Sequence, residues 1–83
     1  MGLGPKISKA VFRRDDWKCR KCGFRDGLHP HHIVYKSKGG TDTMDNIITL
    51  CWRCHRDVHE HKVRLDVIRK DRDNLVVKFW RVT

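Results

Sequence analysis

The sequence has no apolar run long enough to span a membrane, no secretory leader, and no internal repeat, low-complexity tract or linker. The first two absences argue against a membrane or secreted protein, so we expect a reducing, cytoplasmic setting and no membrane partner. The lack of repeats and linkers predicts a single domain over residues 1–83. A domain of 83 residues is near the size at which a hydrophobic core alone gives only marginal stability. Something besides the core should therefore help to hold it together.

Acidic residues are scarce relative to basic ones. The chain has 19 Lys and Arg against 10 Asp and Glu, for a formal net charge of +9 and a pI near 9.9. This excess favours a polyanionic partner, of which nucleic acid is the common one. The alternative is a basic surface that is merely solvated.

The N-terminal half shows one helix and two strands. A short basic amphipathic helix is expected over about 6–16, where Ile7, Val11 and Phe12 share one helical face. Strands are expected at 31–35 and 47–50, separated by a polar loop that contains two glycines.

The C-terminal half begins with a helix that starts at Trp52 and runs to about residue 60. A β-hairpin over about 62–82 follows from the alternation of apolar and polar residues, and Phe79 and Trp80 should pack it onto the body. The two arms of this hairpin are expected at 63–68 and 75–82, with residues 70–74 between them.

Four cysteines form two C-x-x-C pairs, Cys19 with Cys22 and Cys51 with Cys54. Two such pairs, separated by a loop or hairpin, match the four thiolates of one tetrahedral zinc ion. Disulfides or a redox dithiol are the alternatives, but a redox pair needs no duplicate and no thioredoxin-like βαβ pattern is present. Because four sulfurs fill the coordination sphere, we expect this Zn²⁺ to be structural.

Four histidines remain as candidates for a second site. His55 and His59 are four residues apart on the predicted helix, so their rings can grip one ion, although this spacing is more often just a polar helix face. His31 and His32 are adjacent on a predicted strand, so their side chains point to opposite sides and should have different tasks. The alternative for this pair is two exposed histidines of a basic protein.

The order of these parts resembles the HNH endonuclease family over about residues 17–60. The pattern reads C-x-x-C, then HH-I-V, a Gly-Gly loop, Asp-Asn before an apolar strand, and L-C-x-x-C-H-x-x-x-H. The resemblance implies an α+β fold, namely a small zinc-stabilised ββα-metal (His-Me finger) domain with an N-terminal helix and a C-terminal β-hairpin. It implies that His32 is the general base and Asn46 the middle letter of the motif. It also implies that one catalytic divalent ion is held by His31, His55 and His59.

Many family members have Asp in place of His31 and Asn in place of His55. The sequence is therefore most similar to an all-histidine branch that includes nuclease domains of some bacterial toxins, which favours a bacterial or phage context. The catalytic ion is left open among Mn²⁺, Mg²⁺, Ni²⁺, Co²⁺ and Zn²⁺.

The chemistry of phosphodiester hydrolysis explains these residue types. A neutral imidazole at His32 can take the proton from an attacking water, and an ion with three protein ligands keeps open positions for the phosphate and the leaving oxygen. Asn46 cannot shuttle protons, so it should hydrogen-bond across the loop between the strands and fix the backbone that aims His32. We therefore expect a metal-dependent DNA endonuclease, nicking or cutting both strands by a one-metal mechanism.

Basic residues beside the motif are candidates for phosphate contacts, although each could be merely solvated. No separate sequence-reading module is recognisable, so we expect mainly backbone contacts to DNA, a monomer or weak dimer, and room for a partner protein that supplies specificity. The candidates are Arg13, Arg14, Lys18, Arg20, Lys21, Lys36, Lys38, Arg53 and Arg56.

Two other functions stay open. A non-catalytic zinc module that binds DNA or RNA would use the same cysteines and basic residues, but would not need the four histidines in register. A structural or protein-interaction domain would carry the histidines only incidentally.

Overall fold

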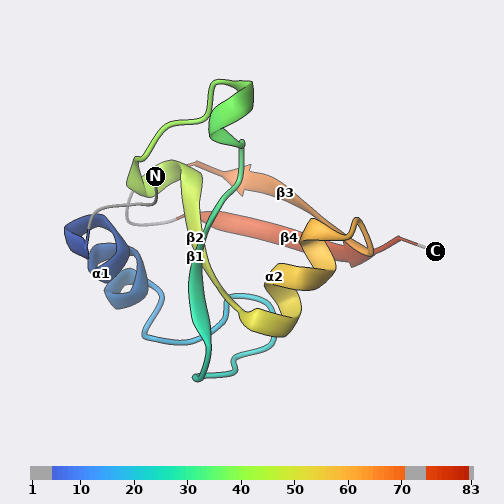
Figure 1. Ribbon diagram of the computed structural model, residues 1–83, viewed down its shortest axis with the longest axis horizontal. Helices are drawn as coiled ribbons and strands as arrows, with labels where there is room; N and C mark the ends of the chain where they lie inside the picture. Colours follow the sequence, from blue (N-terminus) through green and yellow to red (C-terminus); the bar gives the residue numbers. More distant parts are fainter. Residues whose placement is uncertain (1–4, 71–74, 83) are drawn as a thin grey trace.

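The computed structural model describes residues 5–70 and 75–82 of the chain (Figure 1). It is a small α+β structure, as the sequence predicts. No helix in this described part is long and apolar enough to cross a membrane. The elements are α1 (Pro5–Arg14), β1 (Leu28–His32), the 3-10 turns η1 (Lys36–Lys38) and η2 (Met44–Asn46), β2 (Ile47–Cys51), α2 (Trp52–His59), β3 (Val63–Arg69) and β4 (Val76–Arg81).

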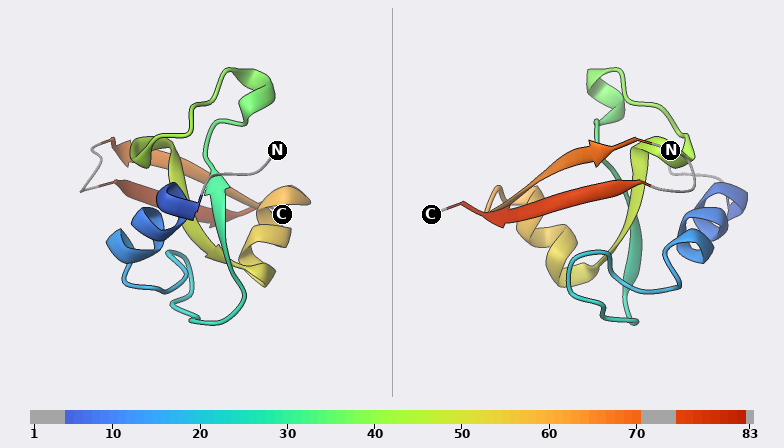
Figure 2. Two further views of the ribbon diagram at one scale, coloured as in Figure 1. Left: turned by 60° about the vertical axis from the view of Figure 1, so that its left-hand side comes forward. Right: turned by 180° about the vertical axis from the view of Figure 1, so that it is seen from behind.

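The strands form two antiparallel pairs. In the first pair, His31 of β1 lies opposite Ile48 of β2, and His32 lies opposite Ile47. The second pair is the hairpin of β3 and β4, whose register shifts between Val67 and Arg69. Helix α2 follows β2 directly and contacts β1, β2 and β3, so β1, β2 and α2 make a ββα unit. Figures 1 and 2 show α1 and α2 on opposite sides of the β1–β2 pair.

Strand β2 lies at the centre of the core. All five of its residues are buried, because α1 contacts it from one side and α2 from the other. Ile48 and Leu50 of β2 join Val63 of β3 and Leu75 in one buried cluster, which also includes three of the cysteines. The core therefore connects the metal-binding cysteines to the hairpin.

Two predicted elements have boundaries that differ from the structure by two residues or more. Helix α1 ends at Arg14 rather than near residue 16, because Asp16 and Trp17 adopt positive φ angles of 60° and 54°. The strand expected at 31–35 instead spans Leu28–His32. Beyond it, the side chain of Asn46 accepts a hydrogen bond from the backbone N–H of Val34 and donates one to its carbonyl. Those two backbone groups are thereby withdrawn from strand pairing.

The predicted C-terminal hairpin is confirmed in its two arms, while residues 71–74 of its connection lie outside the described residues. Phe79 packs against the core cluster, as expected. The same expectation for Trp80 is wrong, because the Trp80 residue is 37% exposed to solvent. Neighbouring residues on a strand point to opposite faces, so Phe79 and Trp80 cannot both face the core.

Candidate metal centres and active site

The four cysteines come together in one cluster, and their sulfur atoms all lie within 4.8 Å of one another. The Sγ atoms of Cys22 and Cys51 are 3.6 Å apart. Sulfurs that share a tetrahedral zinc ion lie roughly 3.8 Å apart, given a Zn–S bond of about 2.3 Å. Cys19 and Cys22 lie in the loop after α1, and Cys51 and Cys54 lie where β2 passes into α2. The donor set and its spacing therefore fit a structural zinc site.

The pKa values of the thiols in this cluster are shifted in opposite directions. Burial raises the pKa of Cys19, but hydrogen bonds from the backbone of Cys22, Cys51 and Lys21 outweigh it and lower the pKa to about 7. Burial, followed by the three neighbouring thiols, raises the pKa of Cys54. Thiols packed together do not all ionise readily, because neighbouring negative charges repel one another. A divalent cation bound between them would favour ionisation of all four, because its charge stabilises each thiolate.

A second cluster contains the histidines predicted as ligands of a catalytic ion. His55 and His59 of α2 lie with ring centroids 5.9 Å apart and nearly parallel planes, 10° between them. The ring of His31, from β1, lies 5.3 Å from that of His55 and almost perpendicular to it, at 81°. The structure thus brings the ring of His55 next to those of His31 and His59, which come from two separate elements. Among the described residues, donor atoms close enough for one ion are found in the cysteine cluster and not in this one.

Burial favours the neutral form of His31. The residue is only 4% exposed, and this burial, together with His55, His32 and His59 nearby, lowers its pKa to about 4. Burial also lowers the pKa of His55, followed by the influence of His29 and His59. Metal ions bind imidazole in its unprotonated form, so these shifts keep ring nitrogens available.

His29 was not identified from the sequence. It lies two residues before His31 on β1, and its ring stacks on that of His55 with centroids 5.4 Å apart. Residues two apart on a strand share a face, so the period of β1 could have indicated this neighbour had the strand been predicted to begin at Leu28.

His32, the last residue of β1, has different partners from His31. Its Nε2 atom lies 2.6 Å from Oδ1 of Asp42, and the other carboxylate oxygen of Asp42 accepts a hydrogen bond from Nζ of Lys36 at 2.9 Å. The hydrogen bond from His32, followed by that from Lys36, lowers the pKa of Asp42. Asp42 was missed in the sequence, because only the path of the loop between β1 and β2 brings it to His32.

Asn46 is buried, and its side chain makes hydrogen bonds to backbone groups of that loop. Its Oδ1 accepts from the N–H of Val34 at 2.9 Å, and its Nδ2 donates to the carbonyls of Val34 at 3.0 Å and Thr41 at 2.9 Å. The backbone of Ile33 adds a hydrogen bond to the carbonyl of Asn46 at 2.8 Å. These bonds close the loop that carries Asp42 and lie directly after His32.

Two of the nine basic candidates are engaged inside the protein. Arg14 bonds the buried carboxylate of Asp15 through Nε at 2.8 Å, and its side chain is only 7% exposed. Arg20 reaches the same carboxylate at 2.6 Å and also donates to the carbonyl of Leu75. Asp15 in turn accepts from the backbone N–H of Thr49, so this network ties α1 to β2. Arg14 is therefore a structural residue rather than a free phosphate ligand, and Arg20 is largely committed as well.

The remaining basic candidates are exposed. Arg53 lies over the rings of Phe24 and Trp52 at 5.4 and 5.5 Å, and Arg56 lies over Trp52 at 5.4 Å. Lys36 is bound to Asp42, as described above. The other exposed candidates are Arg13, Lys18, Lys21 and Lys38.

Comparison with known proteins identifies relatives of the chain. EcoKMcrA of Escherichia coli (strain K12), a type IV methyl-directed restriction enzyme, is 33% identical over an alignment of 73 residues that covers 77% of this chain and 26% of the enzyme. The chain thus corresponds to about a quarter of that enzyme. Anaredoxin of Nostoc sp. (strain PCC 7120) is 29% identical over an alignment of 65 residues that covers 77% of this chain and 86% of that protein.

The family model for HNH endonuclease matches residues 19–61. This segment begins at the first zinc-site cysteine, contains the whole ββα unit, and ends just after α2. It covers the four clustered cysteines and all six histidines. By this match over half of its length, the chain belongs to the HNH endonuclease family.

Proposed function

We propose that the chain is a metal-dependent DNA endonuclease that hydrolyses phosphodiester bonds, with His32 as its general base. One observation carries this proposal. His31, His55 and His59 gather on one side of β1, while the adjacent His32 is held separately by Asp42. A module that only binds nucleic acid needs the cysteines, but it does not need three histidines grouped as metal ligands and a fourth oriented separately by a carboxylate.

Asp42 supports the role of His32 as a base. If Nε2 of His32 donates its hydrogen to Asp42, then Nδ1 is the nitrogen that can accept a proton from an attacking water. The carboxylate also stabilises the imidazolium that forms once the proton has been taken. Asn46 acts through the backbone, by holding the loop on which Asp42 is presented.

The three clustered histidines would hold the catalytic ion. Their donor set fits a first-row divalent metal, because imidazole is a good ligand for such ions and burial keeps His31 unprotonated. When bound, the ion would stabilise charge on the phosphoryl oxygens and on the departing 3′ oxygen. Three protein ligands leave positions for these oxygens.

We further propose that Zn²⁺ fills the cysteine cluster and that DNA is the substrate. The formal charge of +9 and the exposed basic residues suit a phosphate backbone, and the restriction enzyme among the relatives supports DNA over RNA. A DNA substrate and bacterial relatives fit a chain that works inside the cell, as a monomer or weak dimer. Methyl-directed recognition belongs to that longer relative.

A plasmid-nicking assay tests the proposal. Purified zinc-loaded protein should convert supercoiled plasmid to the nicked form with added Mn²⁺, but neither with chelator nor after His32→Ala. The wild type could instead bind plasmid in a mobility-shift assay without nicking it in the presence of Mn²⁺, Mg²⁺, Ni²⁺, Co²⁺ or Zn²⁺. That result would identify the chain as a non-catalytic nucleic-acid-binding module.

A further inference from the structure

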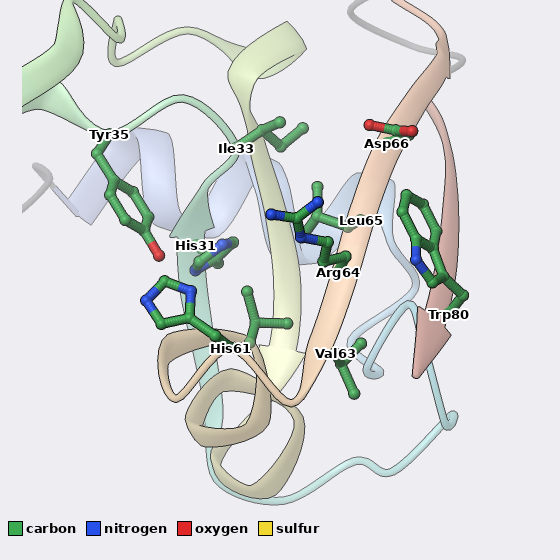
Figure 3. A pocket seen from close by; sticks show the side chains of 10 residues that line it. His31, Ile33, Tyr35, His61, Val63, Arg64, Leu65, Asp66 and Trp80 are labelled. Carbon is green, nitrogen blue, oxygen red and sulfur yellow. The ribbon is translucent and has the colours of Figure 1, made fainter. Parts of the chain in front are cut away.

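A groove of about 300 Å³ runs from His31 to the C-terminal hairpin (Figure 3). Tyr35 and His61 line it on the side of the histidine cluster, and Arg64, Asp66 and Trp80 line it on the hairpin side. The hairpin begins at Val63, beyond the segment that matches the family. Half of the groove is therefore built by a part of the chain to which the family match assigns nothing.

The side of the groove near the histidines is aromatic and polar. The ring of Tyr35 meets that of His31 edge-on at 5.9 Å and lies 6.4 Å from that of His59. Figure 3 shows the Tyr35 hydroxyl directed toward His31 and His61. His61 has a positive φ of 61° because it lies in the turn that ends α2, with its backbone N–H bonded to the carbonyl of Val58 at 3.1 Å and that of Lys62 to the carbonyl of Asp57 at 2.8 Å.

The hairpin side carries a cation beside an exposed ring. Arg64 of β3 lies opposite Trp80 of β4, and Asp66 lies opposite Lys78. All four are exposed, because the intervening residues of the strands, such as Leu65, face the core. In Figure 3 the guanidinium of Arg64 extends from β3 toward His31, and Trp80 lies on the other side of β3, on β4.

Arg64 is available to a ligand. Among residues 5–70 and 75–82, its side chain makes no hydrogen bond or ion pair, in contrast to Arg14 and Arg20. A guanidinium and an exposed indole that line the same groove suit a nucleotide, because the guanidinium can bind the phosphate and the indole can pack against sugar or base. Asp66, farther along β3, disfavours a phosphate at its own end and can accept a hydrogen bond from an exocyclic amine of a base.

We propose that this groove binds the nucleotide next to the scissile phosphate, with Arg64 on the flanking phosphate and Trp80 against the sugar or base. The inference rests on the proposed endonuclease function, because it places the reacting phosphate at the histidine cluster. Tyr35 and His61 line the groove on the side of the histidine cluster, beside His31. The hairpin thus becomes part of the DNA-binding surface.

Nuclear magnetic resonance spectroscopy of the zinc-loaded protein with a short DNA duplex, without added divalent ion, tests the contact directly. The indole N–H signal of Trp80 and the Nε–H signal of Arg64 should shift and saturate together with duplex binding measured by fluorescence anisotropy. The Trp80 signal is assigned by its loss in Trp80→Phe. Unchanged Arg64 and Trp80 signals at saturating duplex would overturn the proposal.

Variants test the energetic contribution. Arg64→Ala and Trp80→Ala should each weaken duplex binding about 5- to 20-fold, and Trp80→Phe should recover most of the loss. Arg64→Ala should also lower the slope of log affinity against log salt by about one.

Lys78→Ala is the matched control, since it removes one positive charge from the same hairpin face outside the groove. It should change affinity less than about 2-fold, on the expectation that a charge without a phosphate contact adds little to binding. Equal losses for Arg64→Ala and Lys78→Ala would contradict a specific groove.

The two proposals fail in different ways. A wild-type protein that never cuts DNA, but shows the Trp80 shift and the Arg64 effect, would refute the nuclease and still support nucleotide binding in the groove. A protein that cuts normally, and does so equally well after Arg64→Ala and Trp80→Ala, would refute the groove and leave the nuclease intact. Native melting curves and full zinc content must accompany each variant, so that unfolding is not taken for lost contact.

Discussion

Nε2 of His32 lies 2.6 Å from Oδ1 of Asp42, a residue ten positions further along the chain. The loop between β1 and β2 makes this contact, and Asn46 holds the loop through three backbone hydrogen bonds. A histidine oriented by a carboxylate is a recurrent arrangement for a general base, because the carboxylate selects the tautomer and stabilises the charged ring. In this chain the arrangement stands beside the candidate metal-binding histidines.

Replacing Asp42 with Asn should lower the single-turnover cleavage rate about 10- to 100-fold, because the amide no longer stabilises the imidazolium. DNA affinity and binding of the catalytic ion should stay within a few-fold of wild type, because the partners of Asp42 within residues 5–70 and 75–82 are His32 and Lys36 rather than the candidate metal ligands. The measurement is cleavage of supercoiled plasmid beside calorimetric titration of the ion. If Asp42→Asn slows cleavage equally in wild-type and His32→Ala backgrounds, the carboxylate does not act through His32.

His31→Ala and His32→Ala should impair cleavage for different reasons. Loss of His31 should weaken binding of the catalytic ion, so high Mn²⁺ should partly restore cleavage. Loss of His32 should cost about 10²- to 10⁴-fold in rate, with ion binding, zinc content and DNA affinity nearly intact. Single-turnover cleavage across Mn²⁺ concentrations separates the two. A His32→Ala protein that cuts within a few-fold of wild type would remove His32 from the role of base.

Cys22→Ser should prevent native folding. Cys22 is exposed, so its side chain contributes little packing, and a large effect would have to come from lost zinc coordination. Circular dichroism, melting and measured zinc content report the outcome, with Ser37→Ala as an exposed control. A Cys22→Ser protein that keeps a cooperative melt without zinc would contradict the structural zinc site.

The histidine cluster should bind Mn²⁺, Co²⁺ or Ni²⁺ more tightly than Mg²⁺. Imidazole is a better ligand for borderline ions, whereas Mg²⁺ prefers oxygen ligands and gives up water reluctantly. Calorimetric titration of zinc-loaded wild type and of His55→Ala isolates this site. Tighter binding of Mg²⁺ than of Mn²⁺ would refute the all-imidazole assignment.

Protonation of His31 should make stability depend on pH. Its pKa falls from 6.5 to about 4 on folding, so the unfolded chain binds more protons between these values. The free energy of unfolding is therefore unaffected by His31 above pH 6.5 and decreases as the pH falls toward 4. The loss at pH 5 is about 2 kcal/mol. Urea unfolding at pH 7.5 and pH 5, without added divalent ion, should show a larger loss for wild type than for His31→Asn. Equal losses would mean that burial of His31 is not coupled to protonation.

Local patterns in the sequence predicted most of the elements and the composition of both clusters. The spacing of Cys19 and Cys22, and of His55 and His59, depends only on the covalent chain and the helix period. The hairpin followed from alternation, and both of its arms are observed. The first strand was misplaced because Leu28–His32 contains a proline and three histidines, and its limits are instead decided by pairing with β2.

Tertiary structure decided what each charged residue can do. The sequence indicated Arg14 as a phosphate contact and did not indicate Arg64, yet the fold places Arg14 against Asp15 in the interior and leaves Arg64 at the groove that Trp80 also lines. It also brings Asp42 to His32, a contact that no helix or strand period predicts. The sequence by itself determined the ligand types and their local spacing, since these follow from short-range geometry. Which side chains meet across the fold is decided by packing of β1, β2, α2 and the hairpin, because electrostatic and hydrogen-bond partners are chosen by proximity in space.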